Sequence, residues 1–303
     1  MNYAAKILNY LAGQDGFSQV LLVAGAPPID KRNHDLRVVL DAILTPDDIR
    51  ETLTTFAAHA RRPGGPELGR QGVFAFGLTN LGRFRVHHLT QRGSDIVTIQ
   101  KMPFTVPELT AILAQPAVLE ELDALYAGRE GGIVLVTGPS AFGNVQFVYA
   151  LLKRINDTAA RVLFIVEQNL SFLLRHKNSV VIQIEVGTDI GSLEEGIRNG
   201  LFLAPDVLYV RDVRTPAELV ALMSAAEAGS LVFASVVALD EKFVLEDLRA
   251  RLEDQYDNFC RLFKGIIRVG PTPRGTLDLR FTNVTVDGTG RIVLQPQSKR
   301  SPP

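Results

Sequence analysis

The first hundred residues show a pattern of apolar and polar positions that predicts a small α/β domain. Helices are expected at 3–12 and from about 47 to 60, where Thr45 and Pro46 form a typical helix start. A loop rich in Arg, Pro and Gly follows the second helix. Strands are expected at 19–24, 73–77, 82–89 and 95–102.

From about residue 130 onward, apolar β-branched runs alternate with longer segments of helical character. This alternation predicts a mostly parallel sheet that is covered by helices on both faces. Asp287-Gly288 indicates a tight turn within β-hairpin material at 265–296. Strands are predicted at 132–137, 161–167, 180–186, 206–211 and 231–239, and helices at 144–155, 192–202, 216–228 and 241–264.

The expected organisation has four parts. Residues 1–105 form the first domain, and a helical linker covers 106–127 with its helix over 107–127. The second domain covers 128–297, and a polar tail that we expect to be disordered covers 298–303.

Composition narrows the classes of function. The 303 residues carry a formal net charge of −1 with acids and bases interspersed, which argues against a nucleic-acid partner or direct insertion into a membrane. The single cysteine, Cys260, excludes an internal disulfide, so a reducing cytoplasm is expected. No apolar run reaches the roughly 18 residues of a membrane span, and the N-terminus lacks the layout of a signal peptide.

The segment 131–145 has the outline of a phosphate-binding loop without its chemical groups. An apolar strand runs into Gly138, and Gly143 completes a G-x-x-x-x-G pattern. A working loop continues with Lys and then Ser or Thr, because the ammonium reaches the phosphates and the hydroxyl binds Mg²⁺. Losing that charge-assisted hydrogen bond, worth about 1.5–3 kcal/mol, predicts nucleotide binding weaker by roughly 10- to 100-fold. The candidate loop residues are Gly138, Pro139, Ser140, Ala141, Phe142, Gly143, Asn144 and Val145, with Asn144 and Val145 at the Lys and Ser/Thr positions.

Two carboxylates follow apolar strands and are the candidate catalytic groups. Glu167 closes one strand, and Asp212 follows the strand that begins at Asp206. Ligands of open α/β sheets bind at the carboxyl ends of strands, so either group could hold a metal or orient water; each could equally be a solvated strand end. Arg211 would repel a metal ion, and it either replaces the charge that the loop lacks or forms a surface salt bridge.

Strand alternation places Arg83, Arg85 and His87 on one face of the strand at 82–89. Two arginines on one face can grip a phosphate or a partner's carboxylates, or can simply face solvent. The histidines show no metal-ligand spacing, and neither a nucleophile elbow nor a zinc motif is present.

The order of these motifs resembles the bacterial type II/type IV secretion ATPase superfamily, and most closely its type IV pilus retraction (twitching motility) ATPases, PilT. The resemblance covers about residues 5–285. It implies a PAS-like N-terminal domain followed by a RecA-like ATPase domain, in a ring-shaped hexamer with nucleotide between domains. Besides the loop, it rests on Gly25-Ala26-Pro27-Pro28, Gly82-Arg83-Phe84-Arg85-Val86, Ile165-Val166-Glu167-Gln168-Asn169, Ala204-Pro205-Asp206 and Ala225 to Phe233.

The family's catalytic polar residues are replaced while the framework persists. This pattern predicts that the fold and interfaces are retained without hydrolysis, and that Arg83, Arg85 and Arg214 serve interfaces rather than catalysis. The replacements outside the loop are Gln168 in the Asp box, Arg211-Asp212 for the Walker B Gly-Glu, Ser230 and Val237 for the His-box histidines, and Gln100 for an N-terminal-domain arginine.

We therefore expect a PilT-like pseudo-ATPase that is a structural or regulatory partner of a type IV pilus or type II secretion machine. It would be cytoplasmic, peripheral to the inner membrane through partners, and either a homo-oligomer or co-assembled with an active PilT-like ATPase. We expect at most weak binding of ATP or ADP and no use of Mg²⁺. Two alternatives stay open: an atypical active ATPase that uses Glu167 and Asp212, and a scaffold without nucleotide binding. The scaffold predicts Phe142 and Val145 packed into a closed loop.

Overall fold

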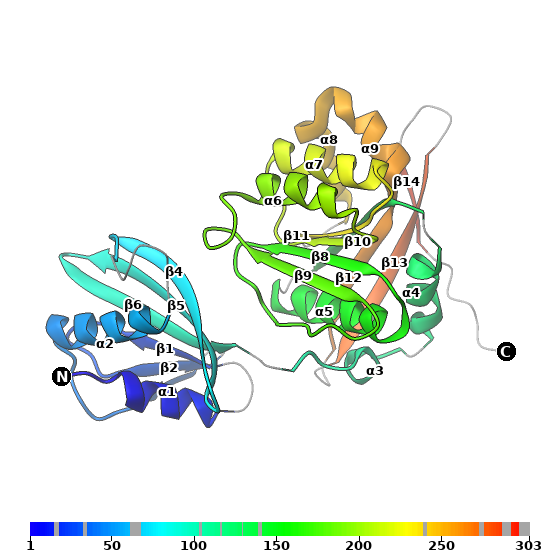
Figure 1. The fold of residues 1–303 in the computed structure, drawn as a ribbon. Helices are drawn as coiled ribbons and strands as arrows, with labels where there is room; N and C mark the ends of the chain where they lie inside the picture. Colours follow the sequence, from blue (N-terminus) through cyan, green and yellow to red (C-terminus); the bar gives the residue numbers. More distant parts are fainter. Residues whose placement is uncertain are drawn as a thin grey trace. The chain divides into compact units, whose positions relative to one another are not determined.

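The chain forms two compact units, Met1–Thr105 and Val106–Pro303 (Figure 1). The predicted turn at Asp287-Gly288 and the predicted disordered tail at 298–303 lie outside the residues whose structure is described. The computed structural model describes residues 1–14, 18–32, 35–60, 68–102, 105–115, 117–128, 130–138, 141–238, 241–272, 276–286 and 292–296.

The first unit is an antiparallel sheet with two helices. Its strand order is β3-β2-β1-β6-β5-β4, and all neighbouring pairs are antiparallel. Val20, Phe84 and Ile99 of the sheet share a buried core with the helices, as expected when one face of a sheet packs on helices. The elements are α1 (Ala4–Ala12), β1 (Gln19–Leu22), β2 (Ile29–Arg32), β3 (Asp35–Val38), α2 (Pro46–His59), β4 (Gln71–Leu78), β5 (Gly82–Gln91) and β6 (Ser94–Met102).

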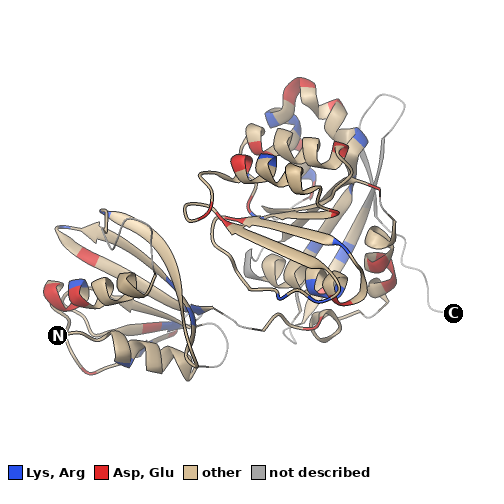
Figure 2. Cartoon of the chain, in the orientation of Figure 1, with Lys and Arg blue, Asp and Glu red and all other residues tan. Residues whose placement is uncertain are grey.

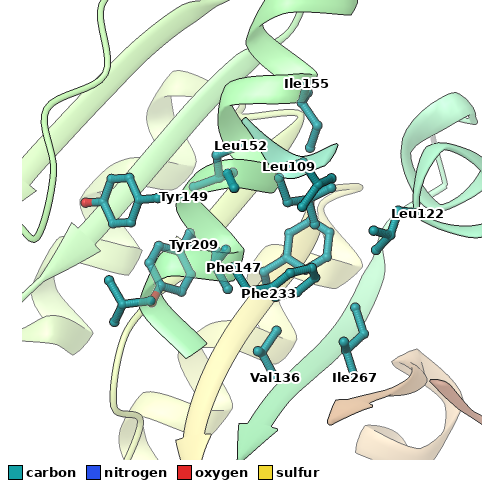
Figure 3. Packing of buried hydrophobic residues seen from close by; sticks show 14 of the residues in the cluster. Leu109, Leu122, Val136, Phe147, Tyr149, Leu152, Ile155, Tyr209, Phe233 and Ile267 are labelled. Carbon is teal, nitrogen blue, oxygen red and sulfur yellow. The ribbon is translucent and has the colours of Figure 1, made fainter. Parts of the chain in front are cut away.

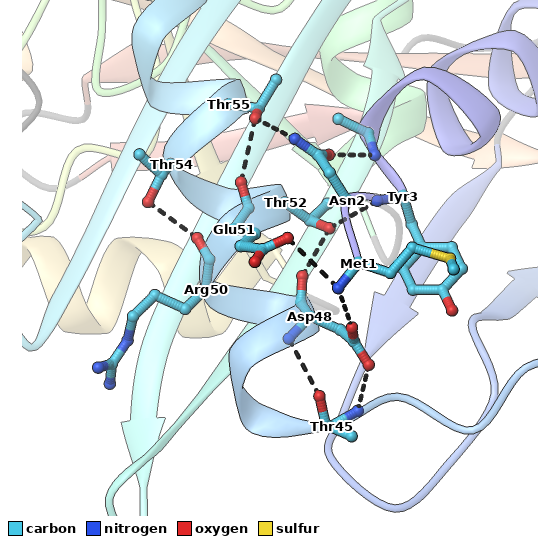
Figure 4. A network of polar contacts seen from close by, with 11 residues as sticks. Met1, Asn2, Tyr3, Thr45, Asp48, Arg50, Glu51, Thr52, Thr54 and Thr55 are labelled. Carbon is cyan, nitrogen blue, oxygen red and sulfur yellow. Dashed lines mark hydrogen bonds and ion pairs between the residues drawn. The ribbon is translucent and has the colours of Figure 1, made fainter.

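The start of α2 follows from reciprocal hydrogen bonds at its N-terminus. The Thr45 hydroxyl accepts from the Asp48 backbone N–H at 3.2 Å, and the Asp48 carboxylate accepts from the Thr45 N–H at 2.8 Å (Figure 4). This capping box satisfies two backbone donors that a helix end otherwise leaves free. The Met1 ammonium also pairs with Asp48, and these contacts lower the pKa of Asp48 to about 2. The segment before α1 is thereby held against α2.

The second unit is built on an eight-stranded sheet of order β14-β13-β12-β7-β11-β10-β8-β9. The strands from β12 to β9 in this order pair in parallel, and β13 and β14 extend the sheet in antiparallel fashion. The strands are β7 (Gly132–Gly138), β8 (Val162–Glu167), β9 (Val180–Glu185), β10 (Val207–Val210), β11 (Leu231–Val237), β12 (Phe263–Pro271), β13 (Leu277–Val286) and β14 (Ile292–Pro296). The helices are α3 (Leu109–Ile112), α4 (Val118–Ala127), α5 (Ala141–Thr158), α6 (Leu193–Gly200), η1 (Leu201–Leu203), α7 (Pro216–Glu227), α8 (Glu241–Leu252), η2 (Glu253–Gln255) and α9 (Tyr256–Leu262).

Helices cover both faces of this sheet (Figure 1). On one face, α3, α4 and α5 pack with alternate strand residues such as Val136, Tyr209 and Phe233 (Figure 3). On the other face, α6 to α9 pack with the intervening residues, among them Leu135 and Leu208. Burial on both faces is the physical reason why these strands are nearly continuous apolar runs in the sequence.

The helix predicted over 107–127 is interrupted. α3 ends at Ile112, after which Leu113 forms a bridge with Leu277, and the Ala114 N–H donates to the Leu277 carbonyl at 2.9 Å. Leu113 is extended, with φ −81° and ψ 133°, so the chain leaves the helix to make this contact.

The helix predicted over 241–264 is also too long. α8 ends at Leu252, and Glu253 takes a left-handed φ of 45° that interrupts the helix. Strand β12 then begins at Phe263. The phenylalanine therefore starts a strand, although its spacing from earlier apolar residues also suits a helix.

The sequence pattern does not reveal β2 and β3. All four residues of β3 are exposed, so the strand has no buried stripe that alternation could detect. Its position at the sheet edge allows charged and apolar residues to mix, because only one side pairs.

The predicted fold class is confirmed: an antiparallel-sheet domain precedes an α/β domain with a mostly parallel sheet. Acidic and basic residues are interspersed along the helices of the second unit (Figure 2). Among the described helices, none combines the length and the apolar character needed to cross a bilayer.

Candidate functional site

The candidate phosphate loop leaves the carboxyl end of β7 and enters α5. β7 is buried at every position, and α5 begins at Ala141. Pro139 and Ser140 lie outside the described residues, and the side chains of Ala141 and Phe142 are likewise not described. The predicted packing of Phe142 therefore stays a prediction.

Asn144, at the lysine position of a phosphate loop, is turned into the protein and is only 1% exposed. Its Oδ1 lies 2.7 Å from the place that a Cβ on Gly138 would occupy, and the Val269 carbonyl of β12 crowds the same place. Gly138 is thus required by the close approach of β12 and Asn144. Within the described structure, neither amide atom of Asn144 has a hydrogen-bond partner. Val145 is 3% exposed, so both substituted positions face inward.

Glu167, at the end of β8, is completely buried and is not a solvated strand end. Its Oε2 accepts hydrogen bonds from the Tyr149 hydroxyl at 2.8 Å and from the Ser171 N–H at 2.7 Å. The Ser171 hydroxyl lies 3.2 Å from Oε1. Burial raises the pKa of Glu167, and the Arg211 charge and these hydrogen bonds only partly oppose it. The carboxylate is therefore enclosed by protein donors.

The aromatic wall beside Glu167 comes from three elements. The Tyr149 ring of α5 meets the Tyr209 ring of β10 edge-on, with centroids 6.0 Å apart (Figure 3). The centroid of the Tyr149 ring also lies 5.0 Å from that of the Phe172 ring. Gln183 of β9 holds the segment after β8 by donating to the Phe172 carbonyl at 2.9 Å. Sequence reasoning missed Tyr149, although a tyrosine on a buried helix face usually indicates a polar partner for its hydroxyl.

Arg211 and Asp212 continue this network at the end of β10. The Arg211 Nη1 donates to the Ser171 hydroxyl at 2.8 Å, and its Nε lies 3.4 Å from the Asp212 carboxylate. The Asp212 N–H donates to the Ser235 hydroxyl at 3.1 Å, and Asp212 has a left-handed φ of 56°. Both side chains of the ion pair are 23% exposed, so it is not an ordinary surface salt bridge. Below, the sheet-edge cluster means Tyr149, Glu167, Ser171, Arg211 and Asp212.

The candidate arginines belong to both units. Arg83 and Arg85 lie on β5 of the first unit, and Arg85 is 8% exposed, opposite Gln100 of β6. Desolvation lowers the pKa of His87, and the nearby Arg85 charge lowers it further, as expected for neighbours on one strand face. Arg214 is exposed on the second unit, just after the sheet-edge cluster.

Residues 71–252, more than half of the chain, match the family described as Type II/IV secretion system protein. The chain belongs to this family. It is 27% identical to the type IV pilus ATPase PilU of Pseudomonas aeruginosa over 241 residues, which cover 80% of this chain and 61% of PilU. It is 28% identical to the type IV pilus retraction ATPase PilT of the same organism over 234 residues, which cover 76% of this chain and 65% of PilT. The chain thus spans less than two thirds of the length of these curated relatives.

Solved structures share the fold. A crystal structure of the pilus retraction motor PilT with bound ADP matches with a TM-score of 0.76 at 24% identity, over 98% of this chain and 83% of that chain. The ATPase DotB of Legionella pneumophila matches with a TM-score of 0.68 at 17% identity, over 90% of this chain and 78% of that chain. These likenesses support the PilT-like fold of this family member.

The side chains at the family's nucleotide position do not suit a Mg²⁺-bound nucleoside triphosphate. Asn144 is neutral and buried, Val145 offers no ligand for a metal, and Glu167 already accepts hydrogen bonds from the protein. Across the described ranges, no group of three or more His, Cys, Asp or Glu side chains could hold a metal ion. What the described part of the loop retains is a glycine-bearing backbone at the start of a long helix, whose N–H groups can contact an anion.

Proposed function

We propose that this family member is a catalytically defective PilT-like protein, acting as a structural or regulatory partner of a type IV pilus or type II secretion machine. It binds ATP or ADP weakly or not at all. It works by assembling into a ring, either with further copies of itself or with an active PilT-like ATPase. In this arrangement Arg83, Arg85 and Arg214 contact neighbouring subunits rather than a reacting phosphate.

The observation that carries the proposal is the inward, buried placement of Asn144. Phosphoryl transfer depends on cations that neutralise charge developing on the phosphates. A neutral amide that is 1% exposed and packed against Gly138 provides no such charge. Rotating it outward would also leave the space beside Gly138 empty.

The surroundings of Glu167 in the sheet-edge cluster support the same conclusion. A general base must reach its proton within about 2.6–3.2 Å. Both oxygens of Glu167 face Tyr149 and Ser171, and the carboxylate has no exposed surface. For Glu167 to act on water, the segment that contains Ser171 would have to move away.

A scaffold without any nucleotide is the second candidate, and it is favoured by the burial of Val145. With Val145 at 3% exposure and Gly138 enclosed between Asn144 and β12, the loop is tightly packed at its two substituted positions. The two candidates differ only in whether the backbone still accepts a phosphate.

Calorimetric titration of ATP and ADP into the purified full chain, with and without Mg²⁺, distinguishes them. We expect no ATP hydrolysis in the same sample, and any nucleotide binding should be weak, with an affinity that Mg²⁺ does not change. Absence of heat at millimolar nucleotide favours the scaffold.

An Asp212→Asn sample prepared in parallel serves as the control for turnover. Hydrolysis that persists unchanged in this variant does not require Asp212 and rejects an ATPase that uses this carboxylate. Hydrolysis that is present in the natural chain and lost in the variant means an active ATPase, and it overturns the proposal. Co-elution of the chain with an active PilT-like ATPase during size-exclusion chromatography tests the assembly.

A further inference from the structure

A cavity lies at the carboxyl edge of the sheet, on the face that α7 and α8 cover. It has a volume of about 190 Å³ and is bordered by the segment after β10, the end of β11 and the first turns of α8. Its walls include Val213 and Val244, which belong to the core beneath α7 and α8, whereas α5 packs on the opposite face. Among the described loop residues Gly138, Gly143, Asn144 and Val145, none lines it, whereas Asp212 of the sheet-edge cluster does.

Part of the pocket wall is apolar, and one apolar side chain at its rim is exposed to water. Val213 and Val244 are 5% and 2% exposed, whereas Phe243 at the rim is 67% exposed. A large aromatic side chain left in water beside a hollow gains free energy when an apolar body covers it. The pocket thus favours a ligand with an apolar part.

The charged groups of the pocket leave one positive charge uncompensated. Asp247 is engaged by Arg251 through contacts of 2.9 and 2.8 Å, and Arg251 also donates to the Arg214 carbonyl. Asp212 lies 3.4 Å from Arg211. Among the described residues, no acceptor or carboxylate pairs with the Arg214 guanidinium, although its backbone N–H is bonded to Glu218. An anionic group at the rim would complement it.

The geometry points to a binding site for a small amphiphilic anion, with an aromatic or branched apolar body against Phe243 and a carboxylate on Arg214. A cavity of about 150 Å³ holds benzene, so a volume of about 190 Å³ suits a ligand of one aromatic ring with a short side chain. A ligand of this size binds with a Kd on the order of 1 mM. The inference rests on the pocket and not on the proposed loss of catalysis, but a ring that uses Arg214 as a subunit contact would compete with the ligand for this side chain.

The test uses the full chain and the probe 3-phenylpropionate, with 3-phenylpropionamide as the uncharged analogue and acetate as the carboxylate without an apolar body. Ligand-observed NMR titrations measure each Kd. The carboxylate should bind about tenfold more tightly than the amide, because a hydrogen bond to a charged group adds roughly that factor. Acetate should bind too weakly to saturate.

Two exposed positions provide variants that do not disturb the core. Arg214→Gln should abolish the preference for carboxylate over amide, and Phe243→Ala should weaken both ligands by several-fold. Arg249→Gln is the matched control for the loss of an arginine charge, because Arg249 lies on α8 with Phe243 but sits over the Tyr256 ring at 6.0 Å and does not line the pocket.

Three results would overturn the inference. They are an unchanged preference in Arg214→Gln, acetate that binds as tightly as phenylpropionate, and the absence of saturable binding. Inorganic phosphate and ADP are added as competitors. Displacement of the probe by ADP in an Arg214-dependent manner would make the pocket part of a nucleotide site instead, and would likewise contradict a site for amphiphilic carboxylates.

Discussion

Removing the Glu167 carboxylate is expected to destabilise the second unit far more than neutralising it. Glu167→Ala deletes the acceptor of the Tyr149 hydroxyl and of the Ser171 N–H, both of which lie in a buried environment. Each stranded donor costs about 1–3 kcal/mol, so the free energy of unfolding should fall by about 4 kcal/mol. Glu167→Gln keeps one oxygen that can accept both bonds, and its change should stay within about 1 kcal/mol.

The raised pKa of Glu167 also predicts how the free energy of unfolding changes with pH. The native pKa of Glu167 is raised above the ordinary value of 4.5, chiefly by burial. The native state therefore holds this proton more tightly than the unfolded chain, so the stabilising contribution is complete below pH 4.5 and is lost as pH rises through the native pKa. Glu167→Gln removes that dependence, so its stability relative to the natural chain should increase as the pH rises above 4.5.

Urea unfolding of the natural chain and of both variants, at one pH below 4.5 and one above it, measures these differences in the free energy of unfolding. The chain has no tryptophan, so the near-ultraviolet signal of its tyrosines, two of which flank Glu167, reports on this region. The slope against urea should not change between variants, because the exposed surface is the same. A loss below about 1 kcal/mol in Glu167→Ala, or an equal loss in Glu167→Gln, would refute the view that this carboxylate is a structural acceptor.

Three further predictions concern the loop, a helix cap and a close backbone contact. Asn144→Lys with Val145→Thr restores the loop motif but should leave ATP turnover undetectable, because Glu167 stays enclosed; Asp212-dependent hydrolysis in this variant would contradict the reasoning. Thr215→Ala removes the acceptor of the Glu218 N–H at 3.2 Å and should lower the free energy of unfolding by about 1 kcal/mol. Thr54→Ala, at an exposed helix position, is the control and should change it by less than about 0.5 kcal/mol. Similar urea midpoints for both variants would argue against a stabilising cap at Thr215. Gly131→Ala would push a Cβ into the Ala226 carbonyl and should lower the free energy of unfolding by about 2–3 kcal/mol. Gly77→Ala is the control, because a Cβ there meets no atom within 4 Å. If thermal unfolding shows that Gly131→Ala is nearly neutral, the backbone at this contact can shift.

The parallel sheet could be predicted because burial on both faces leaves a strong apolar signal in each strand. The edge strand β3 and its neighbour β2 leave no such signal, and β3 is exposed at every position. Helix ends were predictable where a cap is local, as at Thr45, and failed where a tertiary contact decides, as at Leu113 pairing with Leu277. A helix cap can be predicted because its hydrogen-bonding residues are neighbours in the sequence, whereas a contact between distant residues cannot be predicted in this way.

In the candidate site, the positions of the residues could be predicted from the sequence, but their surroundings could not. Asn144, Glu167 and Asp212 were located from the sequence because each follows an apolar strand or a glycine pattern. Their environment was not predictable, because the partners of Glu167 come from the middle of α5 and from an irregular segment after β8. A motif therefore identified the positions, and only the packing around them distinguished an enclosed acceptor from a solvated carboxylate.

The central place of β7 has a consequence for how the chain is synthesised. β7 pairs on one side with β11 and on the other with β12, which begins at Phe263, about 130 residues after Gly132. At a synthesis rate of roughly 5–20 residues per second, this apolar strand waits on the order of ten seconds for its second neighbour to leave the ribosome. The first unit pairs its strands within residues 19–102 and can fold in the meantime. Nascent second units are thus expected to depend on chaperones that shield an unpaired strand edge.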